Sequence, residues 1–137
     1  LNMRCNSFSG YEAKTHTLVD GDITNSYYEN VYPDIKIVTN ATTASLEIGS
    51  GNKIQFDNCI IGEVITIDMN TRIMKSYANA VDYGTLTEYS ARATSLYSSW
   101  NVDPMVKAYL KVPSGTTSIT PIGCATYDLD WKEPKLL

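Results

Sequence analysis

The chain has 137 residues and a formal net charge of −4, with 43% hydrophobic and 19% charged side chains. Its length predicts a single domain, 1–137, with a two-layer core. Because the chain is acidic and has no basic stripe, we expect no nucleic-acid partner. No apolar run reaches the roughly 18 residues that cross a bilayer, so we also expect no membrane partner. The chain starts at Leu1, not Met, which favours a fragment of a longer protein.

The first thirty residues are weakly patterned. Residues 3–8 are predicted as an opening strand, 11–17 alternate only weakly, and 16–19 are a candidate second strand. Asp20-Gly21-Asp22 supplies a turn. The polar and aromatic segment 24–29 is expected to run along the edge of a sheet.

The clearest pattern lies between Tyr32 and Asp68, where short runs alternate polar and apolar residues. Pro33, which lacks a backbone N–H, suits the first position of the strand that follows it. Side chains on a strand point alternately to opposite faces, so each run has one wet face and one dry face. Runs about ten residues apart predict an antiparallel β-sandwich or barrel. The runs are residues 34–38, 45–48, 53–57 and 63–68.

The pattern changes in the second half of the chain. Residues 72–77 are predicted to pair with 64–68 as a hairpin around Asn70 and Thr71. From 78 to 104, aromatic and aliphatic residues recur at intervals of three, four or seven, as on one face of a short helix. Many Ser and Thr residues there compete for backbone hydrogen bonds and disfavour a long helix. We therefore expect a long loop or short helix around 78–104, covering one end of the sandwich.

The chain then returns to strands. Residues 107–112 place apolar side chains at 108, 110 and 112 on one face. Pro113-Ser114-Gly115 is a turn, and residues 118–122 and 125–132 are predicted as closing strands. Gly123 between them marks a turn or a bulge.

The reactive residue types form no catalytic or metal-binding pattern. Cys5, Cys59 and Cys124 are odd in number and lack CxxC spacing, and His16 is the single histidine. A disulfide with one reactive thiol remains an alternative, but we interpret the cysteines as small buried hydrophobes of a chain made in a reducing cell. His16 has no nucleophile at a recognisable spacing. We expect no enzyme activity, no cofactor and no metal.

Two neighbouring carboxylates have a simple structural interpretation. Asp128 and Asp130 share one face of a predicted strand, and Tyr127, Leu129 and Trp131 share the other. Catalytic carboxylate pairs of glycosidases face each other across a cleft rather than occupying neighbouring exposed positions. We therefore expect a wet strand face opposite a buried one.

Aromatic residues offer a possible binding surface. An exposed ring can stack on a saccharide while amides and carboxylates reach its hydroxyls. The interpretation that we favour is that most rings fill the core and rim of the sandwich. The candidates for saccharide or partner contact are the rings in predicted loops or edges: Tyr27, Tyr28, Tyr32, Tyr83, Tyr89, Tyr97 and Trp100.

Several features, in this order, carry a family resemblance. They are the opening strand 1–8; Asn25, Pro33, Ile35 and Ile37; the hairpins of 45–68; the turn at Leu110, Pro113, Gly115 and Ile119; and the close at 127–137, with Trp131, Leu136 and Leu137. In these features the chain resembles the C-terminal domain of the distal tail proteins of long-tailed phages that infect Gram-positive bacteria. It departs from the family at 78–104, which is longer and richer in Tyr and Ser than the family's loop.

The resemblance implies a fold and a role. The fold is a galectin-like, jelly-roll-like β-sandwich that follows an N-terminal belt domain. The belt forms a hexameric ring at the virion tail tip, where it joins the tail tube to the host-recognition baseplate, so the implied partners are other tail proteins. The parent protein would be a homo-hexamer and this fragment a monomer. The alternative function is a carbohydrate-binding module for host cell-wall saccharide, with 78–104 as its binding surface.

Overall fold

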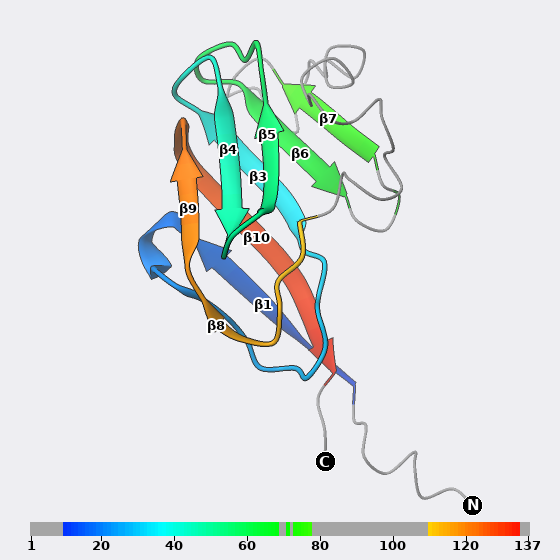
Figure 1. Ribbon diagram of the computed structural model, residues 1–137. Coiled ribbons are helices and arrows are strands. Elements are labelled where there is room, and N and C mark those ends of the chain that lie inside the picture. The colour runs from blue at the N-terminus through cyan, green and yellow to red at the C-terminus, as the bar shows by residue number, and fades with distance from the viewer. Residues whose placement is uncertain (1–9, 69–70, 72, 78–109, 135–137) are drawn as a thin grey trace, which may run out of the picture.

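The computed structural model describes residues 10–68, 71, 73–77 and 110–134, and these form an antiparallel β-sandwich (Figure 1). The predicted all-β class is confirmed, and of the two predicted architectures the sandwich is the one observed. In chain order the elements are β1 (Tyr11–Thr17), the short 3-10 helix η2 (Leu18–Asp20), β2 (Ile23–Asn25), β3 (Asp34–Thr39), β4 (Ala44–Ile48), β5 (Asn52–Phe56), β6 (Val64–Asp68), β7 (Ile73–Tyr77), β8 (Gly115–Thr117), β9 (Ile119–Ile122) and β10 (Cys124–Pro134).

The strands form two layers. One layer is a five-stranded sheet in the order β1-β10-β3-β6-β7. The other contains the three-stranded sheet β5-β4-β9 and the two-stranded ribbon β2-β8, and β8 runs almost directly into β9. Figure 1 shows β4, β5 and β9 in front of β3, β6 and β10. The first and last described strands pair with each other, with β1 at the edge of the larger sheet and β10 between β1 and β3.

The core lies between the two layers. Along β3 and β10 every second side chain is buried, as the sequence predicts, and the side chains between them face solvent. Each large apolar side chain fully buried there stabilises the fold by about 1.5–3 kcal/mol. Among the described residues, the largest fully buried side chains are Ile23, Ile37, Leu46, Ile48, Ile54, Phe56, Ile65, Ile67, Leu110, Tyr127 and Leu129.

The predicted hairpin and the predicted bulge are confirmed. β6 and β7 pair from Asp68 opposite Ile73 to Val64 opposite Tyr77. Gly123 joins β9 to β10 with φ +69°, and the register shifts just after it. A Cβ at Gly123 would lie 2.0 Å from the backbone oxygen of Thr43, so the turn packs directly on the β3–β4 loop and admits only glycine.

The strand predicted over 16–19 is wrong. His16 and Thr17 end β1, and the chain then turns through η2. The Asp20 carboxylate accepts hydrogen bonds from the Thr17 N–H at 2.8 Å and from the Thr17 hydroxyl at 3.1 Å. These bonds lower the pKa of Asp20 and close the turn that ends the strand.

Two other strand predictions are too long. The extended segment predicted over 24–29 is a strand only as far as Asn25. Within 107–112, the described residues from Leu110 contribute one β-bridge, between Val112 and Val31, rather than a strand. Leu110 and Val112 are both fully buried. The predicted apolar face is therefore present, although these residues do not form the continuous backbone hydrogen bonds of a strand. Residues 3–8, 78–104 and 107–109 lie outside the described residues.

The two described cysteines pack as apolar residues. Cys59 is buried in the core and Cys124 is half-buried in β10, and neither forms a disulfide. Burial raises the pKa of the Cys124 thiol to about 11. Over the described part of the chain, no helix is long and apolar enough to cross a membrane.

Candidate functional site

The outer face of the five-stranded sheet carries two rows of charged residues. Lys36 in β3 pairs with Thr66 in β6, and Thr66 pairs with Lys75 in β7, so the two lysines flank one threonine across three strands. The neighbouring row is acidic: Asp130 in β10 pairs with Asp34 in β3. The two rows lie two residues apart along β3, about 7 Å at roughly 3.4 Å per residue.

Asp68 extends the acidic row to β6. It follows Ile67, the partner of Ile35, so register places it beside Asp34. Asp130 is exposed and lies opposite the face that buries Tyr127, Leu129 and Trp131, which confirms the predicted division of β10 into wet and dry faces. The row itself was not predicted, because it depends on the strand order β10-β3-β6.

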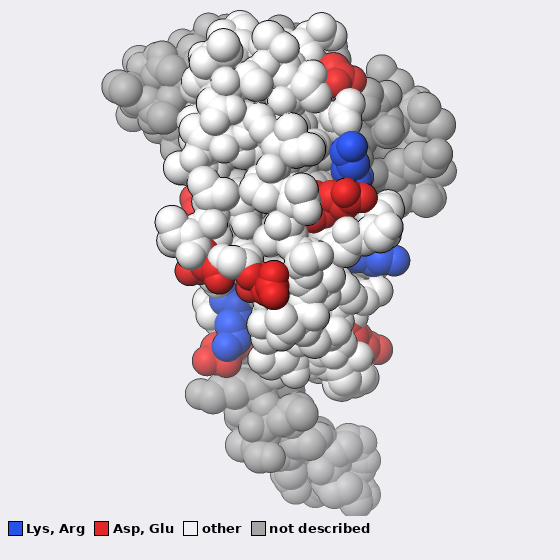
Figure 2. Space-filling view, turned by 60° about the vertical axis from the view of Figure 1, so that its left-hand side comes forward, with Lys and Arg blue, Asp and Glu red and all other residues white. Residues whose placement is uncertain are grey.

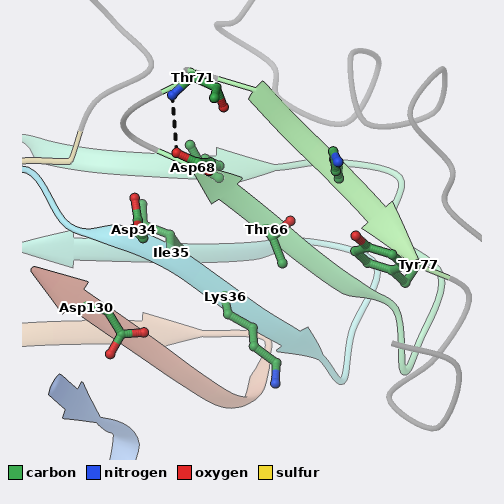
Figure 3. A pocket seen from close by; sticks show the side chains of 10 residues that line it. Asp34, Ile35, Lys36, Thr66, Asp68, Thr71, Tyr77 and Asp130 are labelled. Carbon is green, nitrogen blue, oxygen red and sulfur yellow. Dashed lines mark hydrogen bonds between the residues drawn. The ribbon is translucent and has the colours of Figure 1, made fainter. Parts of the chain in front are cut away.

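These rows line an open pocket of about 460 Å³ (Figure 3). Tyr77 of β7 contributes the one aromatic ring of its wall, and Thr66 and Thr71 contribute hydroxyls. Two of its carboxylates are held in place. Asp130 Oδ1 accepts a hydrogen bond from the Thr15 hydroxyl at 2.6 Å, and Asp68 Oδ1 accepts one from the Thr71 N–H at 3.2 Å.

A second candidate surface is the tyrosine loop, residues 26–32 between β2 and β3. The rings of Tyr27 and Tyr28 are 4.5 Å apart between centroids and are tilted by 51°. Tyr28 is 72% exposed and Tyr32 50% exposed, whereas Tyr27 packs partly against the core. Hydrogen bonding to Tyr28, with partial desolvation, raises the pKa of Tyr27 to about 12. Of the predicted candidates, Tyr27 and Tyr28 are therefore in contact, and Tyr32 lies in the same loop.

A buried amide fixes the tyrosine loop. Asn25 is 1% exposed, and its Nδ2 donates to the carbonyls of Glu29 at 2.8 Å and Val112 at 3.0 Å. Its Oδ1 accepts from the Tyr27 N–H at 2.9 Å. The Ser114 hydroxyl adds a hydrogen bond to the Tyr27 carbonyl at 2.6 Å. The loop backbone is thus held to the segment that precedes β8.

A third candidate surface is the isoleucine loop, residues 57–63 between β5 and β6. Ile60 is 52% exposed and Ile61 67% exposed. Glu63, only 1% exposed, accepts hydrogen bonds from the Ile60 N–H at 2.9 Å and from the Ser76 hydroxyl. The Thr39 hydroxyl donates to the Ile60 carbonyl at 2.7 Å. Two aliphatic side chains therefore reach solvent from a firmly held backbone.

His16 is buried in β1. It is 5% exposed, its Nε2 has no hydrogen-bond partner, and its ring lies 5.9 Å from the ring of Tyr127. Burial lowers the pKa of the imidazole, although the Asp20 carboxylate and a hydrogen bond with the Gly21 backbone oppose that shift. In the described ranges, no three His, Cys, Asp or Glu side chains are grouped so as to hold a metal ion.

The charges elsewhere are mixed. Figure 2 shows one side of the molecule, where acidic and basic side chains lie next to one another and uncharged residues cover most of the surface. On β1, Lys14 Nζ and Glu12 Oε1 lie 3.3 Å apart. Exposed pairs of this kind contribute about 0–1 kcal/mol to stability. On this side, contact with a partner would depend on shape and apolar surface more than on net charge.

The other predicted contact residues, Tyr83, Tyr89, Tyr97 and Trp100, lie outside the described residues. Sequence reasoning missed both loop anchors. Asn25 entered only through the family pattern, and Glu63 was assigned to the start of a strand. Neither carries a local signal of burial, because each is buried by contacts with distant segments.

Comparison with known proteins gives a match in structure only. No family model matches the chain, and no curated protein matches its sequence. Its fold is similar to the crystal structure of the SPP1 Dit (gp 19.1) protein, described as a paradigm of the hub adsorption apparatus in phages that infect Gram-positive bacteria. The TM-score is 0.54 at 9% sequence identity. The match covers 89% of this chain and 47% of SPP1 Dit, so the chain spans about half the length of that protein. At this identity the likeness establishes the fold alone.

Proposed function

We propose that this chain is a structural module of a phage or prophage tail tip, corresponding to the C-terminal domain of a distal tail protein. The fold similarity to SPP1 Dit, over 89% of this chain and 47% of Dit, is the observation that carries the proposal. The order of sequence features that resembles the same family supports it independently of the structure.

In this role the module connects neighbouring tail proteins and requires no catalysis of its own. The parent protein forms a homo-hexameric ring through its belt domain, and the sandwich contributes protein–protein contacts between tail tube and baseplate. The isoleucine loop suits such contact, because Ile60 and Ile61 present apolar surface on a backbone that Glu63 holds rigid. Rigid apolar side chains lose little conformational freedom on binding.

Location in the virion tests the proposal. Gold-labelled antibodies against this domain are expected to mark the distal end of the tail when particles are viewed by electron microscopy. Labelling of the capsid, or absence of the protein from purified particles, would contradict the proposal. The mass of the full-length parent in solution tests the ring, for which we expect six copies.

The isoleucine loop provides a sharper test. Ile60→Ser combined with Ile61→Ser is expected to reduce assembly of infectious particles at least tenfold while leaving the melting temperature of the domain nearly unchanged. Val19→Ser is the matched control, because Val19 is an exposed aliphatic residue in η2, outside the loop. Equal assembly by the double variant and the control would exclude this loop as a docking surface.

A further inference from the structure

We infer that the pocket on the outer face of the five-stranded sheet binds a short neutral saccharide. This inference goes beyond the docking role proposed above and does not depend on it. It places the ligand on β3, β6, β7 and β10, among described residues, and not on the segment 78–104 that the sequence favoured.

The lining has the chemical groups that a sugar requires. A pyranose ring presents C–H groups on its faces and hydroxyls at its edge. The Tyr77 ring supplies an apolar wall for a C–H face. The carboxylates of Asp34 and Asp130 accept hydrogen bonds from sugar hydroxyls, and the Lys36 ammonium donates to them. Figure 3 shows these residues around one pocket, with Asp34 and Lys36 on β3, Tyr77 on β7 and Asp130 on β10.

The dimensions of the pocket also fit. Its volume of about 460 Å³ lies within the roughly 300–1,000 Å³ of small-molecule sites. The lysine row and the aspartate row are about 7 Å apart, and the four strands β10, β3, β6 and β7 span about 14 Å. Tyr77 pairs with Val64 and so lies two residues beyond Lys75, about 7 Å from the lysine row on the side away from the aspartates. The polar groups are thus spread over an area suited to a short saccharide, and the pocket is open enough for a longer chain to extend beyond it.

The charge pattern favours a neutral ligand over a strongly charged one. Among the described lining residues there are three aspartates and two lysines, a formal charge of 2 − 3 = −1. A polyanion such as a phosphate-linked wall polymer would meet the row of Asp130, Asp34 and Asp68. A basic peptide would meet Lys36 and Lys75 in the adjacent row. A neutral polyhydroxyl ligand avoids both repulsions and can use both signs of charge as hydrogen-bond partners.

The carboxylates are oriented before any ligand arrives. Thr15 holds Asp130 from the neighbouring strand β1, and the backbone of Thr71 holds Asp68. Because both carboxylates lie on paired strands and are already hydrogen-bonded, little rotamer freedom is lost when a ligand binds. The same groups on mobile loops would bind a sugar less tightly.

Titration by NMR tests the inference on the 137-residue chain. Maltotriose, cellotriose and tri-N-acetylchitotriose are the probes, followed through backbone amide shifts. At least one is expected to give saturable shifts concentrated in β3, β6 and β7. Asp34→Asn, an exposed and nearly isosteric change, is expected to weaken binding at least fivefold, and Tyr77→Ala at least tenfold. The matched control is Tyr28→Ala, an aromatic deletion in the tyrosine loop, which should leave the affinity unchanged.

Several outcomes would overturn it. Absence of saturable shifts with all three saccharides, or shifts that map to the tyrosine loop and vanish in Tyr28→Ala, would exclude this pocket as the site. If a tetra-lysine peptide or polyglycerol phosphate binds more strongly than any saccharide, the ligand of the pocket is a basic peptide or a polyanion and not a neutral saccharide. None of these results affects localisation to the tail tip, so failure of this inference is distinguishable from failure of the proposed function.

Discussion

The tyrosine loop and the isoleucine loop lie at opposite ends of the sandwich (Figure 1), and each presents exposed apolar side chains from a backbone fixed by one buried polar residue. At one end the anchor is the neutral amide of Asn25, with three hydrogen bonds to backbone groups. At the other it is the carboxyl group of Glu63, which bonds the Ile60 N–H and the Ser76 hydroxyl.

The difference between the anchors has physical consequences. An amide both donates and accepts, so Asn25 can satisfy carbonyls and an N–H at once, without a charge. A carboxylate only accepts, but its hydrogen bonds are stronger because the acceptor is charged. Burying that charge is tolerated only while its partners remain in place. The isoleucine end should therefore be the more sensitive to loss of its anchor and of the packing around it.

The largest expected effect comes from Gly123→Ala, which disrupts packing at the isoleucine end. The new Cβ would lie 2.0 Å from the Thr43 oxygen, and the adjoining β3–β4 loop bonds the isoleucine loop through Thr42 and Cys59. We expect a loss of about 4 kcal/mol or more in the free energy of unfolding, because backbone strain and a backbone clash add together. Urea unfolding measures it.

Gly51→Ala is the matched control for that change. Gly51 lies in the β4–β5 turn with φ +83°, and a Cβ there would meet nothing within 4 Å. Its cost should be the backbone strain alone, about 1 kcal/mol. Equal losses for the two variants would mean that the Gly123 turn moves away from Thr43 without penalty.

Removing the charged anchor should have the next largest effect. Glu63→Ala leaves the Ile60 N–H and the Ser76 hydroxyl without their acceptor, and we expect a loss of about 3 kcal/mol in unfolding free energy. Glu63→Gln keeps one acceptor oxygen and should lose only about 1 kcal/mol, since the Ser76 hydroxyl can rotate to accept from the new amide. A loss for Gln as large as that for Ala would show that a neutral acceptor cannot replace the carboxylate.

Removing Asn25, the neutral anchor of the tyrosine loop, should lower the free energy of unfolding by less. Asn25→Ala breaks three hydrogen bonds, but water can reach some of the released groups in the exposed loop, and we expect a loss of about 2 kcal/mol. Asn25→Asp should be worse than Ala, because a carboxylate would face the Glu29 and Val112 carbonyls. Thermal unfolding at neutral pH compares the two. An Asp variant as stable as the wild type would show that the amide donor has no role.

The sequence predicted the sandwich better than it predicted these ends. Strands β3 to β7 follow from alternating residues joined by short turns, and the wet face of β10 follows from the same rule. The end of β1 at Thr17 and the bridge of Val112 to Val31 were missed because side-chain capping by Asp20 decides the first and a distant partner the second. The pocket was missed for a related reason: Asp34 and Asp130 become neighbours only through a pairing of strands about a hundred residues apart.

The smallest expected effect is a dependence of the free energy of unfolding on pH that comes from His16. This contribution has to be known before the stabilities of the two ends are compared at different pH values. His16 is the single histidine, and burial lowers the pKa of its imidazole in the folded state. The unfolded chain therefore binds a proton near pH 6.5 that the folded chain accepts only at lower pH. Stability is complete above about pH 6.5 and falls as the pH decreases toward the folded pKa.

Replacing the imidazole by a ring of similar size tests this assignment. The groups that act on His16 are Asp20, whose pKa is lowered, and Tyr127, whose pKa burial raises to about 12, so neither titrates with it near neutral pH. His16→Phe keeps a ring against Tyr127 and removes the titrating nitrogen. Its free energy of unfolding, measured in urea from pH 7.5 down to pH 5.5, should change less than that of the wild type. An identical slope in the two proteins would show that groups other than His16 cause the pH dependence.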